Sequence, residues 1–217
     1  MKLSFKASHH REEGTNFLQV EEPFRFESGG SIPAVTLAYE TWGELDDERS
    51  NAVLILTGLS PNAHAASNED NPSDGWWEPM IGPGKAIDTN RHYVICVNSL
   101  GSCQGSTGPG CVNPETGKQY RLSFPDLVIA DISRAAAMVL EYLGIEQLRA
   151  LIGPSMGGMS CLALLQQNPE ISRHFLAIST AARAEPFAIA VRSLQREIIV
   201  RDPHWQDGAY TDEKWPG

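Results

Sequence analysis

Short apolar runs alternate with helical patterns along the chain, and this alternation limits the fold more than any other feature. Four runs have the length of a strand: residues 52–57, 93–97, 148–152 and 175–178. A continuous apolar run of this length is typical of a strand that is covered on both faces. We therefore expect an α/β fold, with a mostly parallel sheet and helices on both of its faces.

Three helical patterns accompany these runs. Apolar residues recur at helical spacing over residues 128–143, and Gly144 is the expected C-terminal stop of that helix. A second helix is predicted over about residues 155–167. A third is predicted over about residues 186–200, with an apolar face made of Phe187, Ala190, Val191, Leu194 and Ile198.

The N-terminal part predicts a pair of strands. Residues 24–26 and 34–40 are interpreted as these strands, joined by a turn at residues 28–30. Residues 1–23 are then expected to be an N-terminal extension ahead of the folded core.

Two long segments, residues 58–91 and 99–124, are rich in Gly, Pro, Ser and Asn. Loops longer than about 15 residues are uncommon in compact domains, and those that occur usually carry function. For most of their positions we favour a plain surface insertion. Trp76 and Trp77 are expected to pack the first loop down rather than to bind a ligand.

Composition excludes several classes of protein. The chain has 217 residues, 41% hydrophobic and 20% charged, and a formal net charge of −10 without a basic block, which argues against a nucleic-acid partner. No apolar run approaches the ~18 residues of a membrane span, and residues 1–20 do not resemble a signal peptide. The four cysteines lack metal-site spacing, so we expect reduced thiols, no bound metal and a cytoplasmic location.

The pentapeptide Gly153–Gly157, Gly-Pro-Ser-Met-Gly, lies between a predicted strand and a predicted helix. A strand that turns this tightly into a helix requires small residues two positions before and two after the nucleophile. Ser155 is therefore predicted to be a catalytic nucleophile at the carboxyl edge of the sheet. The alternative is a structural turn with an idle serine, and the apolar strand and helix on either side favour the nucleophile.

An oxyanion hole needs two hydrogen-bond donors near that serine. The backbone N–H of Met156 is the first candidate, because it directly follows Ser155. The N–H of Leu59, in the loop after the strand ending near Thr57, is the second. His64 lies further along the same loop and is expected to have a structural role, since the histidine of a triad in such a fold follows the nucleophile in the chain.

From about residue 24 onward the chain resembles the homoserine O-acetyltransferases of the α/β-hydrolase superfamily. The resemblance is spread over six stretches, which together are highly specific: residues 39–45, 75–89, 105–109, 113–117, 153–159 and 202–210. It implies an α/β-hydrolase fold.

The resemblance also implies an O-acyltransferase. In that family acyl-CoA acylates a serine, and the hydroxyl of a small amino acid then takes the acyl group, with no bound cofactor. Carried over to this chain, the nucleophile is Ser155 and the oxyanion donors are Leu59 and Met156. Splitting one transfer into two steps in this way is covalent catalysis.

Three segments, residues 56–64, 98–103 and 192–197, are similar to the branch that uses succinyl-CoA and accepts serine. A succinyl carboxylate would need a cationic or amide partner. Arg192, Arg196 and Asn62 are candidates, although each also fits an ordinary surface or helix position. The sequence leaves open whether the donor carries an acetyl or a succinyl group, and whether the acceptor is homoserine or serine. No other substrate-binding residue is predicted.

The chain departs from the family in its acid and base. After Ser155 the only histidines are His174, which begins a predicted strand, and His204, two residues after Asp202. Asp202 and His204 are expected to form the end of the third helix and its turn. Neither histidine is predicted to complete a triad.

We therefore expect the N-terminal part of a longer enzyme, a homodimer at full length. Residues 24–185 are predicted to be the hydrolase core, without its last two strands, and residues 186–217 the start of a helical lid. The strand at 175–178 would then be an exposed apolar edge. The alternatives are a serine esterase or thioesterase on the same fold, and an inactive fragment that needs a partner chain.

Overall fold

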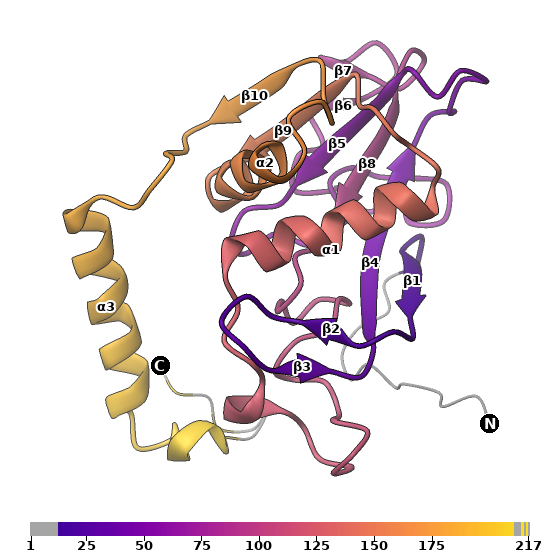
Figure 1. Ribbon diagram of the computed structural model, residues 1–217. Coiled ribbons are helices and arrows are strands. Elements are labelled where there is room, and N and C mark those ends of the chain that lie inside the picture. Colours follow the sequence, from indigo (N-terminus) through magenta and orange to yellow (C-terminus); the bar gives the residue numbers. More distant parts are fainter. Residues whose placement is uncertain (1–12, 211–213, 215, 217) are drawn as a thin grey trace.

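The computed structural model describes residues 13–210, 214 and 216, and its centre is a six-stranded sheet (Figure 1). The strand order is β1-β4-β8-β5-β9-β10. Strands β1 and β4 are antiparallel to their neighbours, whereas β8, β5, β9 and β10 are parallel to one another. The strands are β1 (Asn16–Val20), β4 (Val35–Trp42), β5 (Ala52–Leu56), β8 (Tyr93–Val97), β9 (Ala150–Pro154) and β10 (Phe175–Ile178).

The four apolar runs predicted as strands are confirmed as β5, β8, β9 and β10. All five residues of β5 are buried, as its central place in the sheet requires. The third strand begins and ends two residues later than predicted. It continues to Pro154 because that residue is paired with Ile178 of β10.

The prediction that residues 24–26 and 34–40 pair with each other is wrong. β2 (Phe24–Arg25) pairs with β3 (Ser31–Ile32), because a tight turn reverses the chain between them, with the N–H of Phe26 bound to the carbonyl of Gly30. β4 pairs with β1, which lies in the segment expected to be an extension. That segment therefore contributes a strand to the sheet.

Helices α1 (Ile129–Tyr142) and α2 (Met156–Gln167) cover one face of the sheet (Figure 1). Their apolar side chains pack with Leu54, Leu56 and Leu151 in the larger core cluster. Both helices were predicted within two residues of their ends. Gly144 follows the C-cap of α1 with a φ of +67°, as its role as a stop requires.

The opposite face of the sheet is covered by the loop that follows β5, so the expectation of helices on both faces is wrong for the described residues. Val53 and Ile55 point to this side, and Ala65 and Ala66 of the loop pack on it. The rings of Trp76 and Trp77 stack with centroids 5.3 Å apart and pack against the same cluster. This confirms that they hold the loop down. The loop also contains the short strands β6 (Ile81–Gly82) and β7 (Ile87–Asp88).

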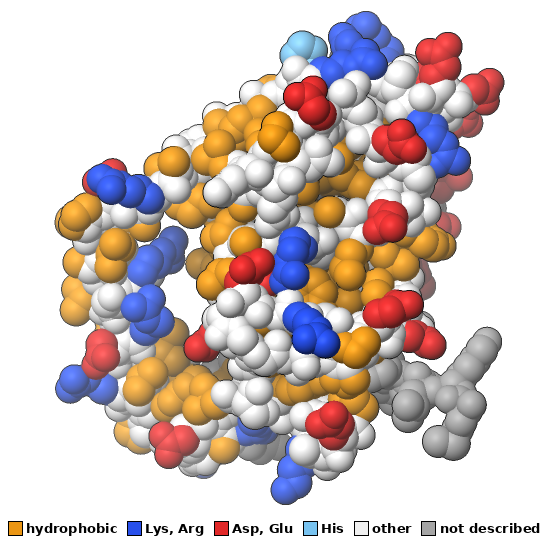
Figure 2. Space-filling view, viewed as in Figure 1, with side chains coloured by type: hydrophobic (Ala, Val, Ile, Leu, Met, Phe, Trp, Pro, Cys, Tyr) orange, Lys and Arg blue, Asp and Glu red, His pale blue; other side chains and the backbone are white. Residues whose placement is uncertain are grey.

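The third predicted helix is α3 (Pro186–Arg201), and it stands apart from the sheet (Figure 1). None of its residues is buried. Figure 2 shows hydrophobic side chains over this helix and along the edge of the body that faces it. The exposed large apolar residues of this helix and of β10 are Leu176, Ile178, Phe187, Ile189, Val191, Leu194, Ile198, Ile199 and Val200.

Two short 3₁₀ turns meet at the far end of the molecule. They are η1 (Arg121–Ser123) and η2 (Gln206–Gly208), and Arg121 donates a hydrogen bond to the carbonyl of Gly208 at 2.9 Å. Among the described residues, no helix combines the length and apolar character that crossing a bilayer requires.

Candidate active site

Ser155 lies at the turn between β9 and α2, where it is the N-cap residue of the helix. Its backbone angles are φ +53° and ψ −123°, a region that residues other than glycine rarely adopt. Such strain costs about 1–3 kcal/mol and is concentrated at functional sites. The turn has the strained form that the pentapeptide predicts.

Two glycines, Gly153 and Gly157, allow the turn to be this tight. A Cβ on Gly153 would lie 2.5 Å from backbone atoms of Gly157 and Gly158, which is closer than real contacts come. A Cβ on Gly157 would overlap the carbonyl oxygen of Leu56 and lie 2.9 Å from that of Thr57. The start of α2 therefore lies directly against the end of β5.

The side chain of Ser155 is exposed at the carboxyl edge of the parallel strands. Its backbone N–H is bound to the carbonyl of Ile178 at 2.9 Å, and its own carbonyl accepts the N–H of Gly158 at 3.1 Å. Within the part of the chain that the structure describes, its hydroxyl has no hydrogen-bond partner. The hydroxyl is thus free to meet a ligand from solution.

The two candidate oxyanion donors belong to segments that adjoin Ser155. Met156 is the first residue of α2, where backbone N–H groups have no partner within the helix and the helix dipole favours negative charge. Leu59 follows Gly58, and a Cβ built on Gly58 would lie 3.8 Å from the Cβ of Ser155. The side chain of Leu59 is 60% exposed. The structure thus brings the Gly58–Leu59 segment to the serine.

The described histidines are all remote from the hydroxyl of Ser155 or already bonded elsewhere. His174 and His92 directly precede β10 and β8, so both lie at the amino edge of the sheet, opposite Ser155. For His174 the separation is about four residues of strand at ~3.3 Å each, or roughly 13 Å. His204 contacts Asp202 at 3.0 Å just after the end of α3, which confirms the expected turn. His9 and His10 lie outside the described residues.

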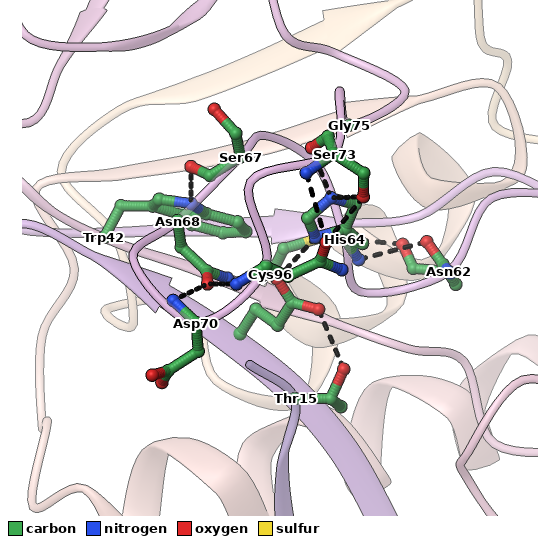
Figure 3. Close-up of polar contacts among 12 residues, drawn as sticks. Thr15, Trp42, Asn62, His64, Ser67, Asn68, Asp70, Ser73, Gly75 and Cys96 are labelled. Atoms are coloured by element: carbon green, nitrogen blue, oxygen red, sulfur yellow. Dashed lines mark hydrogen bonds and ion pairs between the residues drawn. The ribbon is translucent and has the colours of Figure 1, made fainter. Parts of the chain in front are cut away.

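His64 is bound deep in the loop over the second face of the sheet (Figure 3). Its Nδ1 lies 2.9 Å from Oε2 of Glu40, and its Nε2 lies 2.9 Å from the carbonyl oxygen of Ser73. Glu40 is on β4 and is 0% exposed. These contacts fit the structural role that was expected for His64.

The same cluster resembles a Ser–His–Glu triad at first sight, because Oγ of Ser73 lies 3.3 Å from Nε2 of His64. The nearer carbonyl of Ser73 can only accept a hydrogen bond, so Nε2 must carry its proton. A protonated nitrogen cannot take the proton of the Ser73 hydroxyl, which itself donates to Asn71 at 2.6 Å. Ser73 is therefore no activated nucleophile in this arrangement.

The residues suggested for a succinyl carboxylate are separated in the structure. Arg192 and Arg196 lie on exposed α3, where they contact Gln195 and Ser193 of the same helix. Asn62 accepts the backbone N–H of His64 at 3.0 Å through Oδ1. The three side chains do not form one cluster.

Burial disfavours the thiolate form of the two buried cysteines. All four cysteines are free, and burial raises the pKa of Cys161 to about 12. Burial, and then the carboxylate of Glu40, raise the pKa of Cys96 well above its usual range. No group of three or more His, Cys, Asp or Glu side chains in the described residues could hold a metal ion. Ser155 is the one candidate nucleophile that the described geometry favours.

Sequence reasoning missed two residues, one beneath the loop after β5 and one beside Gly158. Glu40 lies within the stretch 39–45, but its burial was not predicted. The available signal was its position two residues before Trp42, on the same face of β4 as that buried ring. Thr180 was also missed, and its side chain lies over Gly158, within 2.7 Å of where a Cβ would be.

Comparisons with known proteins agree with this geometry. A family model described as alpha/beta hydrolase fold matches residues 51–214. A protein named serine O-succinyltransferase from Xanthomonas axonopodis pv. citri (strain 306) is 60% identical over 203 residues, covering 94% of this chain and 51% of that relative. One of the same name from Stenotrophomonas maltophilia (strain K279a) is 57% identical, over 94% of this chain and 55% of that relative.

Two solved structures extend the comparison. The crystal structure of esterase E22 superposes with a TM-score of 0.86 at 35% identity, covering 93% of this chain and 57% of that one. The structure of homoserine O-acetyltransferase from Bacillus anthracis has a TM-score of 0.86 at 33% identity, covering 94% and 57%. The chain spans about half the length of the curated relatives it matches.

Proposed function

The chain belongs to the alpha/beta hydrolase fold family, and from this premise we propose that it is the nucleophile-bearing part of an O-acyltransferase. The fold class expected from the sequence is confirmed, and so is the resemblance to the homoserine and serine O-acyltransferases. The transfer we propose moves a succinyl or acetyl group from CoA to the hydroxyl of serine or homoserine.

One observation carries the proposal. Ser155 has a strained backbone and an exposed hydroxyl at the N-terminus of α2, beside the loop segment Gly58–Leu59. A hydroxyl held there can attack a carbonyl while backbone N–H groups face the negative charge that develops on the oxygen. The names of relatives 57–60% identical to this chain support acyl transfer as the reaction.

In the first step, the Oγ of Ser155 attacks the thioester carbonyl of acyl-CoA. The carbonyl oxygen becomes an oxyanion, which we propose is bound by the N–H groups of Leu59 and Met156. The C–S bond then breaks, the acyl group stays on Ser155 as an ester, and CoA leaves as its thiol after taking the proton released by the serine.

In the second step, the hydroxyl of the acceptor amino acid attacks the acyl ester on Ser155. The ester bond to Ser155 breaks, the proton of the acceptor hydroxyl returns to the serine, and the O-acyl amino acid leaves. Both steps need a base to carry the proton. We propose that this base lies outside the described residues, since no described histidine is bonded to Ser155 and the chain spans about half of its curated relatives.

Succinyl-CoA and serine are the donor and acceptor that we propose first. The support is the printed name of the relatives at 57–60% identity, against 33% for the homoserine O-acetyltransferase structure. We also propose a cytoplasmic enzyme, in accord with four free cysteines and a net charge of −10. The homodimer expected at full length stays a prediction.

The test is an acyl adduct on Ser155. The natural-length protein is incubated with succinyl-CoA or acetyl-CoA without an acceptor, digested and analysed by mass spectrometry. We expect a succinyl group on the peptide containing Ser155, and none in the Ser155→Ala variant. Ser172→Ala, a partly exposed serine just before β10 and so at the opposite edge of the sheet, should leave the adduct unchanged. An adduct that persists in Ser155→Ala would refute the assignment.

A serine esterase is the second candidate, and the superposition on esterase E22 favours it. Both functions use the same acyl-enzyme and differ in what attacks it. Product analysis with saturating serine or homoserine separates them. O-acyl amino acid as the main product supports the transferase, whereas free carboxylic acid at the same rate with and without amino acid supports the esterase.

A further inference from the structure

The loop segment that carries Leu59 has no hydrogen bonds of its own. Within the described part of the chain, residues 59–61 neither donate nor accept one. Their position is therefore set by the residues at the two ends of the segment. At one end is Gly58, which lies against the carbonyl of Pro154 and against Ser155. At the other end is Asn62.

Asn62 is held to the body of the protein by its neighbours. Its carbonyl accepts the indole N–H of Trp76 at 3.0 Å, and its side chain accepts the backbone N–H of His64. The Asn62–His64 turn is therefore held from two sides, by Trp76 at the carbonyl of Asn62 and by His64 at its side chain (Figure 3).

His64 is fixed through Glu40. A fully buried carboxylate is costly unless its oxygens are bonded, and those of Glu40 accept hydrogen bonds from Thr15 at 2.8 Å and Asn68 at 2.9 Å besides contacting His64. One carboxylate on β4 thus ties the residue before β1 and two points of the loop to the sheet. The ring of His64 holds a third point of the loop, because its Nε2 contacts the carbonyl of Ser73.

The contacts of the His64 ring also fix which of its nitrogen atoms carry a proton. Nε2 must donate to the carbonyl of Ser73, so a second proton lies between Nδ1 and the carboxylate of Glu40. The pair is neutral as a whole whichever of the two atoms holds that proton. Turning the ring would break both contacts at once, which makes the pair a rigid anchor.

We propose that Glu40 and His64 are positioning residues that fix the Gly58–Asn62 segment, and with it the N–H of Leu59, against the oxyanion formed at Ser155. This inference rests on the proposed function. Neither side chain touches the substrate in this role. The pair acts by holding the end of a segment that lacks bonds of its own.

The test uses the natural-length enzyme with the variants Glu40→Gln and His64→Gln. Losing one oxyanion donor lowers kcat by about 100- to 1,000-fold, so a displaced donor should lower it by roughly 10- to 1,000-fold. The KM for succinyl-CoA should stay within about threefold, because ground-state binding does not use this N–H. The double variant should be no slower than the slower single variant, since both act through one anchor.

Glu78→Gln is the matched control. Glu78 anchors the same loop through Ser67 and Gly75, and none of its hydrogen bonds reaches Asn62 or His64. It should lose stability and keep kcat within about threefold. If Glu40→Gln and His64→Gln lower kcat no more than Glu78→Gln, the pair is only a structural anchor and the proposal fails.

A second variant covers the case in which both buried substitutions prevent folding. Asn62→Ala removes the bond to His64 at a partly exposed position, and it should lower kcat without raising KM. A folded Asn62→Ala enzyme with native kcat would overturn the proposal.

A p-nitrophenyl ester is measured in parallel. One outcome is that the native enzyme hydrolyses the ester but does not use acyl-CoA, and that the variants hydrolyse the ester more slowly. This result would reject acyl transfer from CoA and keep the positioning role. A native enzyme inactive on both substrates would overturn both proposals.

Discussion

The backbone N–H of Ser155 donates a hydrogen bond to the carbonyl of Ile178, 2.9 Å away. The proposed nucleophile is thereby joined to the last residue of β10, the edge strand of the sheet. β10 is also the strand whose side chains are most exposed, with Leu176 at 45% and Ile178 at 37%. The backbone of the turn between β9 and α2 is therefore bonded to the strand whose side chains are the most exposed.

The first prediction concerns activity. The 217-residue chain alone should not release CoA from succinyl-CoA, because no described residue is bonded to the Ser155 hydroxyl as its base. Losing the base of a triad lowers kcat by several orders of magnitude. A thiol reagent that detects free CoA measures this. Rapid CoA release by the chain alone, abolished in Ser155→Ala, would contradict it.

The second prediction concerns the turn between β9 and α2. Gly157→Ala should destabilise the protein by about 1–3 kcal/mol or more, because the added methyl overlaps the carbonyl of Leu56. Thermal denaturation followed by circular dichroism measures the change. Gly110→Ala is the control, since a Cβ there meets nothing within 4 Å. Equal melting temperatures for the two variants would show that the close packing of α2 on β5 is not as described.

The third prediction concerns the exposed edge. The 217-residue chain should self-associate as its concentration rises, because β10 presents unpaired backbone groups and apolar side chains. Leu176→Lys should weaken this association, as measured by sedimentation velocity. Ser172→Lys adds the same charge outside the strand and should have little effect. Equal association by both variants would place the contact elsewhere.

The fourth prediction concerns pH. The backbone N–H of Ser67, and then Lys85, lower the pKa of Glu78 to about 2 from 4.5. The unfolded chain therefore takes up this proton at a higher pH than the folded chain does. The stabilisation from Glu78 is complete above about pH 4.5 and is lost as the pH falls toward 2.

Urea unfolding at a series of pH values checks this. Glu78→Gln should be less stable than the native protein at pH 7 and should lose less stability between pH 4.5 and 2. Glu22→Gln, which removes a charge from an exposed residue, should keep the native pH dependence. An unchanged slope in Glu78→Gln would show that this carboxylate is not the source.

Local patterns in the sequence were enough for most of the fold. The apolar run at 52–57 and the helical spacing over 128–143 became β5 and α1 because each pattern reflects contacts with whatever lies on its two faces. The partner of β4 was missed. Local patterns do not show which other segment lies along that edge, and the structure places β1 there while β2 pairs with β3 across the short turn after Phe26.

The sequence by itself determined the position of Ser155, because the close packing of a strand-to-helix turn requires small residues two positions before and two after it, here Gly153 and Gly157. It could not determine the anchor beneath the loop. Glu40 and His64 are 24 residues apart, and the alternation along β4 places Glu40 on the face of Trp42 without showing what covers that face. Only the folding of the loop over the sheet buries Glu40, and burial is what makes its partners obligatory.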